Sequence, residues 1–254
     1  MNAREREQVW LLEEKYGGEK NFAFFADVEL LAAGEPLAYI IGHIPFLDTT
    51  IHLDSKPLIP RPETEYWVER AIEAVAARAK RAPQPLRILD LCAGSGCIGV
   101  AVLKALPMVR VDFCEIDAHH HATIEKNIRE NGINPMRAHI FGDNLFEEIA
   151  EQYDYILTNP PYIDPEKRTR VEESVLAHEP HNALFGGKSG LALIERIIKE
   201  APAHLTEQGA LYIEHEPEQS DAVCGIAADA GFASCSPCPD QYGCMRFSLL
   251  ARTV

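Results

Sequence analysis

The chain has 254 residues, of which 46% are hydrophobic and 25% are charged, a balance typical of globular proteins that excludes disordered and fibrous classes. No apolar run approaches the roughly 20 residues of a membrane span, and Met1–Glu7 leads into no apolar segment of the secretory type, so we expect a cytoplasmic protein. The formal net charge of −15 disfavours tight binding to bare nucleic acid and suits a small-molecule ligand or a basic protein partner.

The first 35 residues carry apolar residues at helical spacing. This pattern predicts helices over 3–16 and 21–33, separated by Gly17-Gly18. We expect both tryptophans of the chain, Trp10 and Trp67, to lie in the core rather than in a functional site.

The next 50 residues mix strand and helix signals. Residues 38–53 read as two strands around a turn near Pro45–Asp48, and a short helix is expected after Pro60. The polar, proline-bearing residues 80–85 read as a linker. We therefore predict three parts: a short helical N-terminal region (1–35), a β-hairpin with a connecting helix (36–85) and a larger domain (86–254).

From Leu86 onward, apolar runs of strand length alternate with amphipathic helical stretches. Such alternation predicts parallel strands joined by right-handed crossovers, that is, an α/β doubly wound, mostly parallel sheet. The last two strands form a hairpin, so one of them should run against the others. The predicted strands are 87–91, 109–115, 138–141, 153–157, 210–214, 232–235 and 245–252, and the predicted helices are 97–106, 119–131, 189–204 and 218–230.

The seven cysteines are an odd number in a chain without a secretory pattern, which predicts reduced thiols. The tightest cluster is Cys235, Cys238 and Cys244. It lacks a fourth ligand at suitable spacing for zinc, so we expect no metal and interpret these residues as buried or edge thiols.

A glycine-rich loop follows the strand 87–91. Gly94, Gly96 and Gly99 allow the backbone to approach a ligand and to turn into a helix. The G-x-G-x-x-G string also fits dinucleotide binders. Asp90, directly before the loop, would repel a pyrophosphate and instead suits a cationic ligand that carries an ammonium or sulfonium group.

Acidic residues follow the next two strands. Glu115 can accept hydrogen bonds from both hydroxyls of a ribose, and Asp143 can meet an adenine amino group. Each acid alone is equally well explained as a solvated loop carboxylate. Their occurrence with Asp90 at successive strand ends favours one shared ligand.

The tetrapeptide Asn159-Pro160-Pro161-Tyr162 follows the strand 153–157, at the same sheet edge as the glycine loop. The Asn159 side-chain oxygen and the Pro160 carbonyl can accept the two hydrogens of a planar amino group, and Tyr162 can stack on it. The prolines keep these acceptors rigid. Such a clamp suits methylation of an amide or an aromatic amine by a sulfonium, with alignment supplying much of the rate.

At these residues the chain resembles the class I S-adenosylmethionine-dependent methyltransferases. More narrowly it resembles the protein N5-glutamine methyltransferases of the HemK type, which act on peptide chain release factors or on a large-subunit ribosomal protein. The resemblance covers about residues 35–254, and its departures are the short N-terminal region and the residues Cys92 and Ala93 in the loop. The matching segments are 36–42, 58–65, 90–96, Glu115, 142–146, 159–162, 178–180, 183–187 and 189–190.

The resemblance implies a site, with the cofactor's methionine and ribose parts at the loop and Glu115, its adenine at 143–145, and the substrate amide at 159–162. Arg61, Thr64 and Glu65 are implied to flank the cleft. The implied cofactor-binding residues are Asp90, Cys92, Ala93, Gly94, Ser95, Gly96, Glu115, Asp143, Asn144, Leu145 and Asn159. The implied substrate-binding residues are Asn159, Pro160, Pro161, Tyr162, Glu179 and Pro180, of which Asn159, Pro160 and Tyr162 are the implied catalytic ones.

The resemblance further implies methyl transfer from S-adenosylmethionine to the side-chain amide N5 of a glutamine, foremost the Gly-Gly-Gln glutamine of a peptide chain release factor. A ribosomal protein is the alternative substrate. Nucleic-acid N6-adenine methylation, an inert cofactor-binding protein and an NAD dehydrogenase are more distant alternatives. The expected partner is a protein substrate, without a membrane or direct nucleic-acid contact.

Three further segments are each expected to have a structural or solvent-exposed role rather than a catalytic one. His119-His120-His121 reads as a solvated helix start, and Lys167–Arg170 as a solvated loop or a contact to a partner's backbone or phosphate. Glu214-His215-Glu216 ends a strand near the cleft and is expected to shape the pocket rather than to catalyse.

Overall fold

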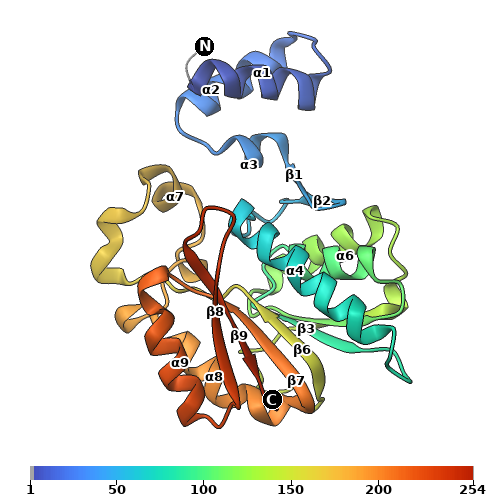
Figure 1. The fold of residues 1–254 in the computed structure, drawn as a ribbon. Helices are drawn as coiled ribbons and strands as arrows, with labels where there is room; N and C mark the ends of the chain where they lie inside the picture. The colour runs from blue at the N-terminus through green and yellow to red at the C-terminus, as the bar shows by residue number, and fades with distance from the viewer. Residues whose placement is uncertain (1–2, 254) are drawn as a thin grey trace.

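The computed structural model describes residues 3–253, so Met1 and Asn2 of the predicted segment 1–35, together with Val254, lie outside the described residues. A seven-stranded sheet forms the centre of the molecule, in the order β5-β4-β3-β6-β7-β9-β8 (Figure 1). Neighbouring strands are parallel except β9, which is antiparallel to β7 and β8, so the predicted fold class and its one reversed strand are confirmed. The strands are β3 (Arg87–Leu91), β4 (Arg110–Cys114), β5 (Ala138–Phe141), β6 (Tyr153–Thr158), β7 (Leu205–Glu214), β8 (Ser234–Pro239) and β9 (Met245–Ala251).

The register of the central strands brings the two sequence motifs to one edge. Leu91 at the end of β3 pairs with Cys114 of β4 on one side and with Thr158 of β6 on the other. Because parallel strands end at the same edge, the glycine loop and Asn159 start side by side.

Two helical layers cover the sheet (Figure 1). Strand residues alternate between the faces, so that Ile88 packs with one layer and Leu89 and Leu91 with the other. One layer holds α4 (Pro62–Ala79), α5 (Cys97–Ala105) and α6 (His121–Glu130), and the other holds α8 (Ala192–His204) and α9 (Ser220–Asp229). A short helix, α7 (Glu173–His178), lies in the long connection before α8.

The N-terminal region forms a small core of its own above the sheet (Figure 1). Its elements are α1 (Ala3–Tyr16), α2 (Phe22–Ala32) and α3 (Leu37–Ile41), followed by the hairpin β1 (His43–Phe46) and β2 (Thr49–His52). The prediction of strand from residue 38 was wrong, because burial of Ile40 against Leu11, Phe24 and Leu31 favours a helical turn despite the β-branched residues.

The helix after Pro60 is also longer than predicted. It runs for 18 residues, and its buried face, which includes Trp67 and Val75, packs on the sheet. The expectation of core burial holds for Trp67, which is fully buried, and was wrong for Trp10, which is 61% exposed. Trp10 lies on α1, which packs in a small helical region that buries only one face of this helix.

The hairpin is fixed to α6 by two asparagine side chains. Asn127 accepts the His52 N–H at 2.7 Å and donates to the His52 and Ser95 carbonyls, and Asn131 accepts the Thr50 N–H at 3.0 Å. The exposed edge of β2 is thereby paired without another strand. Asn127 also ties this hairpin to the glycine loop.

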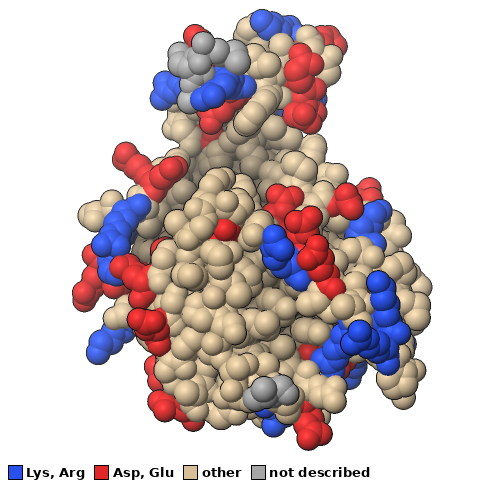
Figure 2. All heavy atoms as spheres, in the orientation of Figure 1, with Lys and Arg blue, Asp and Glu red and all other residues tan. Residues whose placement is uncertain are grey.

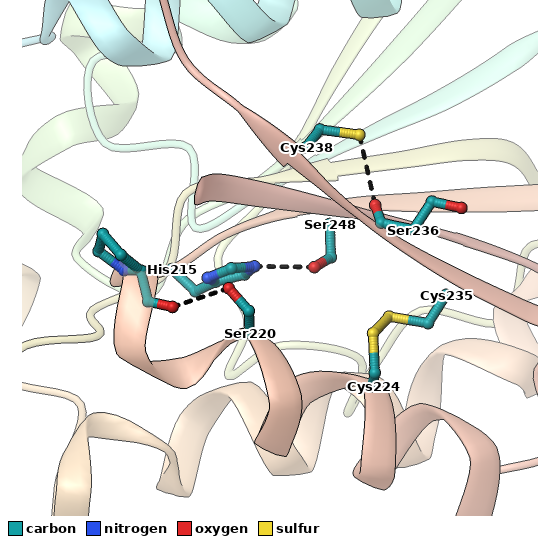
Figure 3. Close-up of a disulfide and its surroundings, with 8 residues drawn as sticks. His215, Ser220, Cys224, Cys235, Ser236, Cys238 and Ser248 are labelled. Atoms are coloured by element: carbon teal, nitrogen blue, oxygen red, sulfur yellow. Dashed lines mark hydrogen bonds between the residues drawn. A yellow bond between two sulfur atoms is a disulfide. The ribbon is translucent and has the colours of Figure 1, made fainter. Parts of the chain in front are cut away.

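The expectation that all the cysteines are reduced was wrong for one pair. Cys224 of α9 and Cys235 of β8 form a disulfide, with 5.4 Å between their Cα atoms (Figure 3). The two are only 11 residues apart, and packing of α9 against β8 brings them together. Cys238 keeps a free thiol that donates to the Ser236 carbonyl, and within residues 3–253 no three His, Cys, Asp or Glu side chains gather as metal ligands.

The surface carries charges of both signs. Figure 2 shows acidic and basic side chains on this face, with several basic side chains gathered at the lower right. None of the helices in the described part of the chain is long and apolar enough to cross a bilayer.

Candidate active site

The glycine loop after β3 takes a conformation that few residue types tolerate. Cys92, Gly94 and Gly96 have φ of +61°, +55° and +76°. At Gly99 the constraint is space, because a Cβ atom would lie 2.3 Å from the Phe113 ring of β4. Glycine at 94, 96 and 99 therefore lets the loop fold back tightly into α5, while Cys92 takes a positive φ despite its side chain.

Asp90 supports this loop from beneath. Its side chain is fully buried and accepts the Gly99 N–H at 2.8 Å, while its Oδ1 atom has no hydrogen-bond partner among residues 3–253. Burial raises the pKa of the Asp90 carboxyl well above its usual range. The structure places Asp90 next to the start of α5, and it does not line the cavity described below.

Glu115 follows β4 and holds the other side of the loop. Its two carboxylate oxygens accept the Gly94 N–H at 2.7 Å and the Asp117 N–H at 2.8 Å. Each oxygen keeps a second lone pair, so the carboxylate can still accept hydroxyl donors from a ligand.

Asp143 organises the segment after β5 in a similar way. It is buried and accepts backbone N–H groups from Asn144 and Glu148. The Asn144 side-chain oxygen accepts from Arg196 of α8 at 3.0 Å. Leu145, at φ +64°, turns the chain so that this segment closes one end of the cavity.

A cavity of about 280 Å³ opens where these strands end. Cys92, Gly94, Glu115, Asp143, Asn144, Leu145, Asn159 and Pro161 of the predicted site line it. Ala93, Ser95 and Gly96 shape the loop without lining the cavity. The lining combines a glycine peptide, the Glu115 carboxylate with free lone pairs and the apolar side chain of Leu145. These groups suit the amino acid, the ribose and the base of S-adenosylmethionine, so the residues present fit this cofactor.

The Asn159–Tyr162 turn separates this cavity from a second one of about 210 Å³. Asn159, Leu58 and Ala183 line both, while Pro160 and Tyr162 line only the second. Within residues 3–253, neither the Asn159 side-chain oxygen nor the Pro160 carbonyl accepts a hydrogen bond. Asn159 therefore offers a free acceptor between the two cavities, and Pro160, which lines the second cavity, offers another.

The turn is held rigidly by the segment before α8. A parallel bridge joins Ile163 to Phe185, and Gln219 donates to the Tyr162 and Ser189 carbonyls at 2.9 and 3.1 Å. Gly190 packs so closely that a Cβ atom there would lie 1.9 Å from the Tyr162 carbonyl oxygen. The backbone of the turn is thus fixed from behind.

Glu214, at the end of β7, is buried under the same turn. Its carboxylate accepts from Thr64 Oγ1 at 2.7 Å, Trp67 Nε1 at 2.6 Å and Tyr162 Oη at 3.0 Å. Burial raises the pKa of the Glu214 carboxyl, and hydrogen bonds from the three donors oppose that rise. Burial also raises the pKa of Tyr162 well above its usual range, so its phenol stays protonated.

Two predicted substrate residues lie elsewhere. Glu179 is buried, accepts the Ile59 N–H at 3.0 Å and pairs with Arg61 at 2.5 Å. It lines a larger groove of about 1060 Å³ between the N-terminal region and the segment 172–179, and Pro180 lines none of these three spaces. Arg61 and Val175 line both the groove and the second cavity, so the two spaces adjoin.

Sequence reasoning missed some contributors. His120 was expected in a solvated helix start, but it is buried, lines the first cavity and hydrogen-bonds Ser55 at 2.8 Å. Only His119 is a solvated residue of that kind. The sequence contains no local signal that tells which of three neighbouring histidines faces a cavity. Leu58, which also lines the first cavity, did have such a signal, because it lies in the matching segment 58–65.

The remaining charged segments are already paired. Lys167 and Arg170 both contact Glu218, at 2.5 and 3.1 Å, and they line a surface recess. Arg170 also lines the second cavity. His215, beside Glu214, hydrogen-bonds Ser248 of β9 at 2.8 Å (Figure 3). Glu214 thus contacts the turn through Tyr162, and Glu216 of the same tripeptide lines the second cavity.

Fold and site together define a methyltransferase of the S-adenosylmethionine-dependent class. Residues 75–221 match the family model described as the methyltransferase small domain. The chain is 35% identical over 213 residues to the release factor glutamine methyltransferase of Geobacter sulfurreducens, a match that covers 84% of this chain and 72% of that protein. The chain belongs to the family of release factor glutamine methyltransferases, which confirms the predicted resemblance.

Solved structures show the same fold at low sequence identity. A methyltransferase from Pyrococcus furiosus superposes with a TM-score of 0.58 at 16% identity, covering 91% of this chain and 98% of that one. The 16S rRNA N2 G1207 methyltransferase of T. thermophilus, solved with AdoMet and guanosine, superposes with a TM-score of 0.57 at 15% identity, and the match covers 84% of this chain and 50% of that one.

Proposed function

We propose that this chain transfers a methyl group from S-adenosylmethionine to the side-chain nitrogen N5 of a glutamine in a peptide chain release factor. The observation that carries the proposal is the pair of free acceptors on neighbouring residues, Asn159 Oδ1 and the Pro160 carbonyl, of which Asn159 lines both cavities and Pro160 the second. Family membership supports the choice of glutamine and of a release factor.

The first cavity supports the cofactor half of the proposal. Glu115 and the segment 143–145 would hold the ribose and the adenine, and the loop from Cys92 to Gly94 would hold the amino-acid part. When bound, S-adenosylmethionine supplies an electrophilic methyl group on a sulfonium. Burial raises the pKa of the Cys92 thiol well above its usual range, so this nucleophile lies in the cavity in its unreactive protonated form.

The second cavity supports the substrate half. Asn159 Oδ1 and the Pro160 carbonyl each accept one N–H of the glutamine carboxamide, which turns the nitrogen lone pair toward the first cavity. Because an amide nitrogen is a poor nucleophile, alignment and these preorganised dipoles are the main source of acceleration. Tyr162 is anchored to Glu214 and lines the wall beside the amide.

The large groove supports docking of a protein. It joins the second cavity at Arg61 and Val175 and extends to Trp10 and Leu31 of the N-terminal helices. Acidic side chains outnumber basic ones along it, which favours a basic protein segment. On this proposal, 1–35 grips the substrate, 36–85 connects, and 86–254 carries the chemistry.

The test supplies methyl-labelled S-adenosylmethionine with purified release factor, ribosomal proteins and duplex DNA in separate reactions. We expect label in the release factor, on its Gly-Gly-Gln glutamine, and none in a control release factor with asparagine at that position. Label in ribosomal protein alone would overturn the choice of a release factor as the substrate. Label in DNA alone, or none anywhere with the cofactor bound, would overturn the reaction.

A further inference from the structure

The carboxylate of Glu214 and the hydroxyl of Thr64 lie directly behind Asn159. Thr158, the last residue of β6, pairs with Ile213 of β7, so Asn159 directly after β6 lies level with Glu214, the last residue of β7. Thr64, near the start of α4, is buried between them and contacts Glu214 at 2.7 Å and Asn159 Nδ2 at 3.2 Å. A continuous chain of hydrogen bonds therefore runs from the buried carboxylate to the asparagine.

The direction of each bond in this chain is fixed by chemistry. Trp67 Nε1 can only donate to Glu214 Oε2, and this oxygen, as part of a carboxylate, can only accept from Thr64 as well. The single Thr64 hydroxyl proton goes to that carboxylate oxygen. Thr64 Oγ1 can then only accept from Asn159, which requires the NH₂ of the carboxamide to face it.

This order decides which end of the Asn159 carboxamide faces the cavities. With its nitrogen bound to Thr64, the amide leaves Oδ1 free where the two cavities meet. The opposite rotamer would set Oδ1 against the Thr64 lone pairs and would offer N–H groups to a substrate that needs an acceptor. Nothing in the asparagine itself selects between the two, because its oxygen and nitrogen have nearly the same shape.

We propose that Thr64 is a positioning residue for methyl transfer, with Glu214 as its anchor, and that together they hold the Asn159 carboxamide with its oxygen toward the substrate. The inference rests on the proposed function for its link to turnover, but the orientation itself is a property of the chain alone. It extends the site beyond the Asn159–Tyr162 turn to a residue on α4, 95 positions away in the sequence.

A matched pair of variants separates the hydroxyl of Thr64 from its volume. Thr64→Val keeps the shape and removes the hydroxyl, so Asn159 Nδ2 loses its partner. Thr64→Ser keeps the hydroxyl and removes a methyl group. We expect kcat for release factor methylation to fall about tenfold in Thr64→Val, with KM and the Kd of S-adenosylmethionine within about twofold of the parent, and to stay within about twofold in Thr64→Ser.

A second measurement reads the orientation without any turnover. The side-chain amide protons of Asn159, followed by ¹⁵N-edited NMR, should exchange about tenfold faster with solvent in Thr64→Val than in the parent protein and in Thr64→Ser, because the hydrogen bond that protects them is lost. Equal exchange in all three proteins, or equal loss in Thr64→Ser and Thr64→Val, would overturn the inference. Unchanged kcat in Thr64→Val would overturn it too.

The two measurements distinguish the two proposals. If the parent protein methylates no release factor but its Asn159 amide protons follow the expected order, the positioning inference stands and the proposed function fails. If the parent protein is active and neither readout responds to Thr64→Val, the proposed function stands and the positioning inference fails.

Discussion

Gly190→Ala tests whether the backbone behind the Asn159–Tyr162 turn is as tightly constrained as the structure indicates. The new Cβ atom would lie 1.9 Å from the Tyr162 carbonyl oxygen and 2.6 Å from Gln219 Nε2, at a φ of +69°. The positive φ costs about 1 kcal/mol for alanine. Displacing Gln219 forfeits its hydrogen bonds to the Tyr162 and Ser189 carbonyls, about 1 kcal/mol each.

The expected loss is therefore about 3 kcal/mol in the free energy of unfolding, or about 6 to 12 °C in Tm for a chain of this size. Gly231→Ala is the matched control, since Gly231 has a φ of +84° and nothing within 4 Å of the added Cβ. This variant should lose only the cost of the positive φ, about 1 kcal/mol in the free energy of unfolding.

Denaturant unfolding of the two variants and the parent gives both free energies, and a labelled-methyl assay at a temperature where all are folded gives turnover. We expect Gly190→Ala to lose turnover more than Gly231→Ala does, because the Tyr162 carbonyl belongs to the turn. Equal stability losses in the two variants would refute the reasoning, since the contact with Tyr162 would then cost nothing.

Three other predictions follow from the site and its surroundings. Asn159→Ala should lower kcat about a hundredfold while the Kd of S-adenosylmethionine, measured by calorimetry, stays within a few-fold; near-normal turnover would exclude the amide clamp. Reduction of the Cys224–Cys235 disulfide should lower the free energy of unfolding by about 2 to 3 kcal/mol, a modest loss because the disulfide closes a short loop. A Cys224→Ser, Cys235→Ser double variant should melt like the reduced protein. Identical melts with and without reductant would contradict this. Burial raises the pKa of Asp90 well above 3.8, so the folded state binds its proton more tightly than the unfolded state, and this group's contribution to stability falls as pH rises from about 4 into the neutral range. Asp90→Asn should therefore gain stability relative to the parent across that range, as urea unfolding at several pH values would show, and a difference that does not vary with pH would contradict the assignment.

Much of the fold was determined by local sequence. The strands at 87–91 and 138–141 and the helix at 3–16 were predicted with the bounds that the structure has, because their apolar periodicity and flanking residues all favour one state. The site motifs were also local: a glycine loop after one strand and Asn159–Tyr162 after another, brought together by the general rule that parallel strands end at one edge.

Tertiary structure decided what local patterns leave open. Residues 38–41 became helical because Ile40 finds partners in α1 and α2, and Cys224 met Cys235 only when α9 packed against β8. Nothing near Thr64 in the sequence announces that its hydroxyl lies between Glu214 and Asn159, since each pair of these residues is more than 50 positions apart. The sequence by itself determined which chemical groups the site contains. The packing of distant segments determined which way those groups point, because a hydrogen bond depends on direction and distance in space and not on separation along the chain.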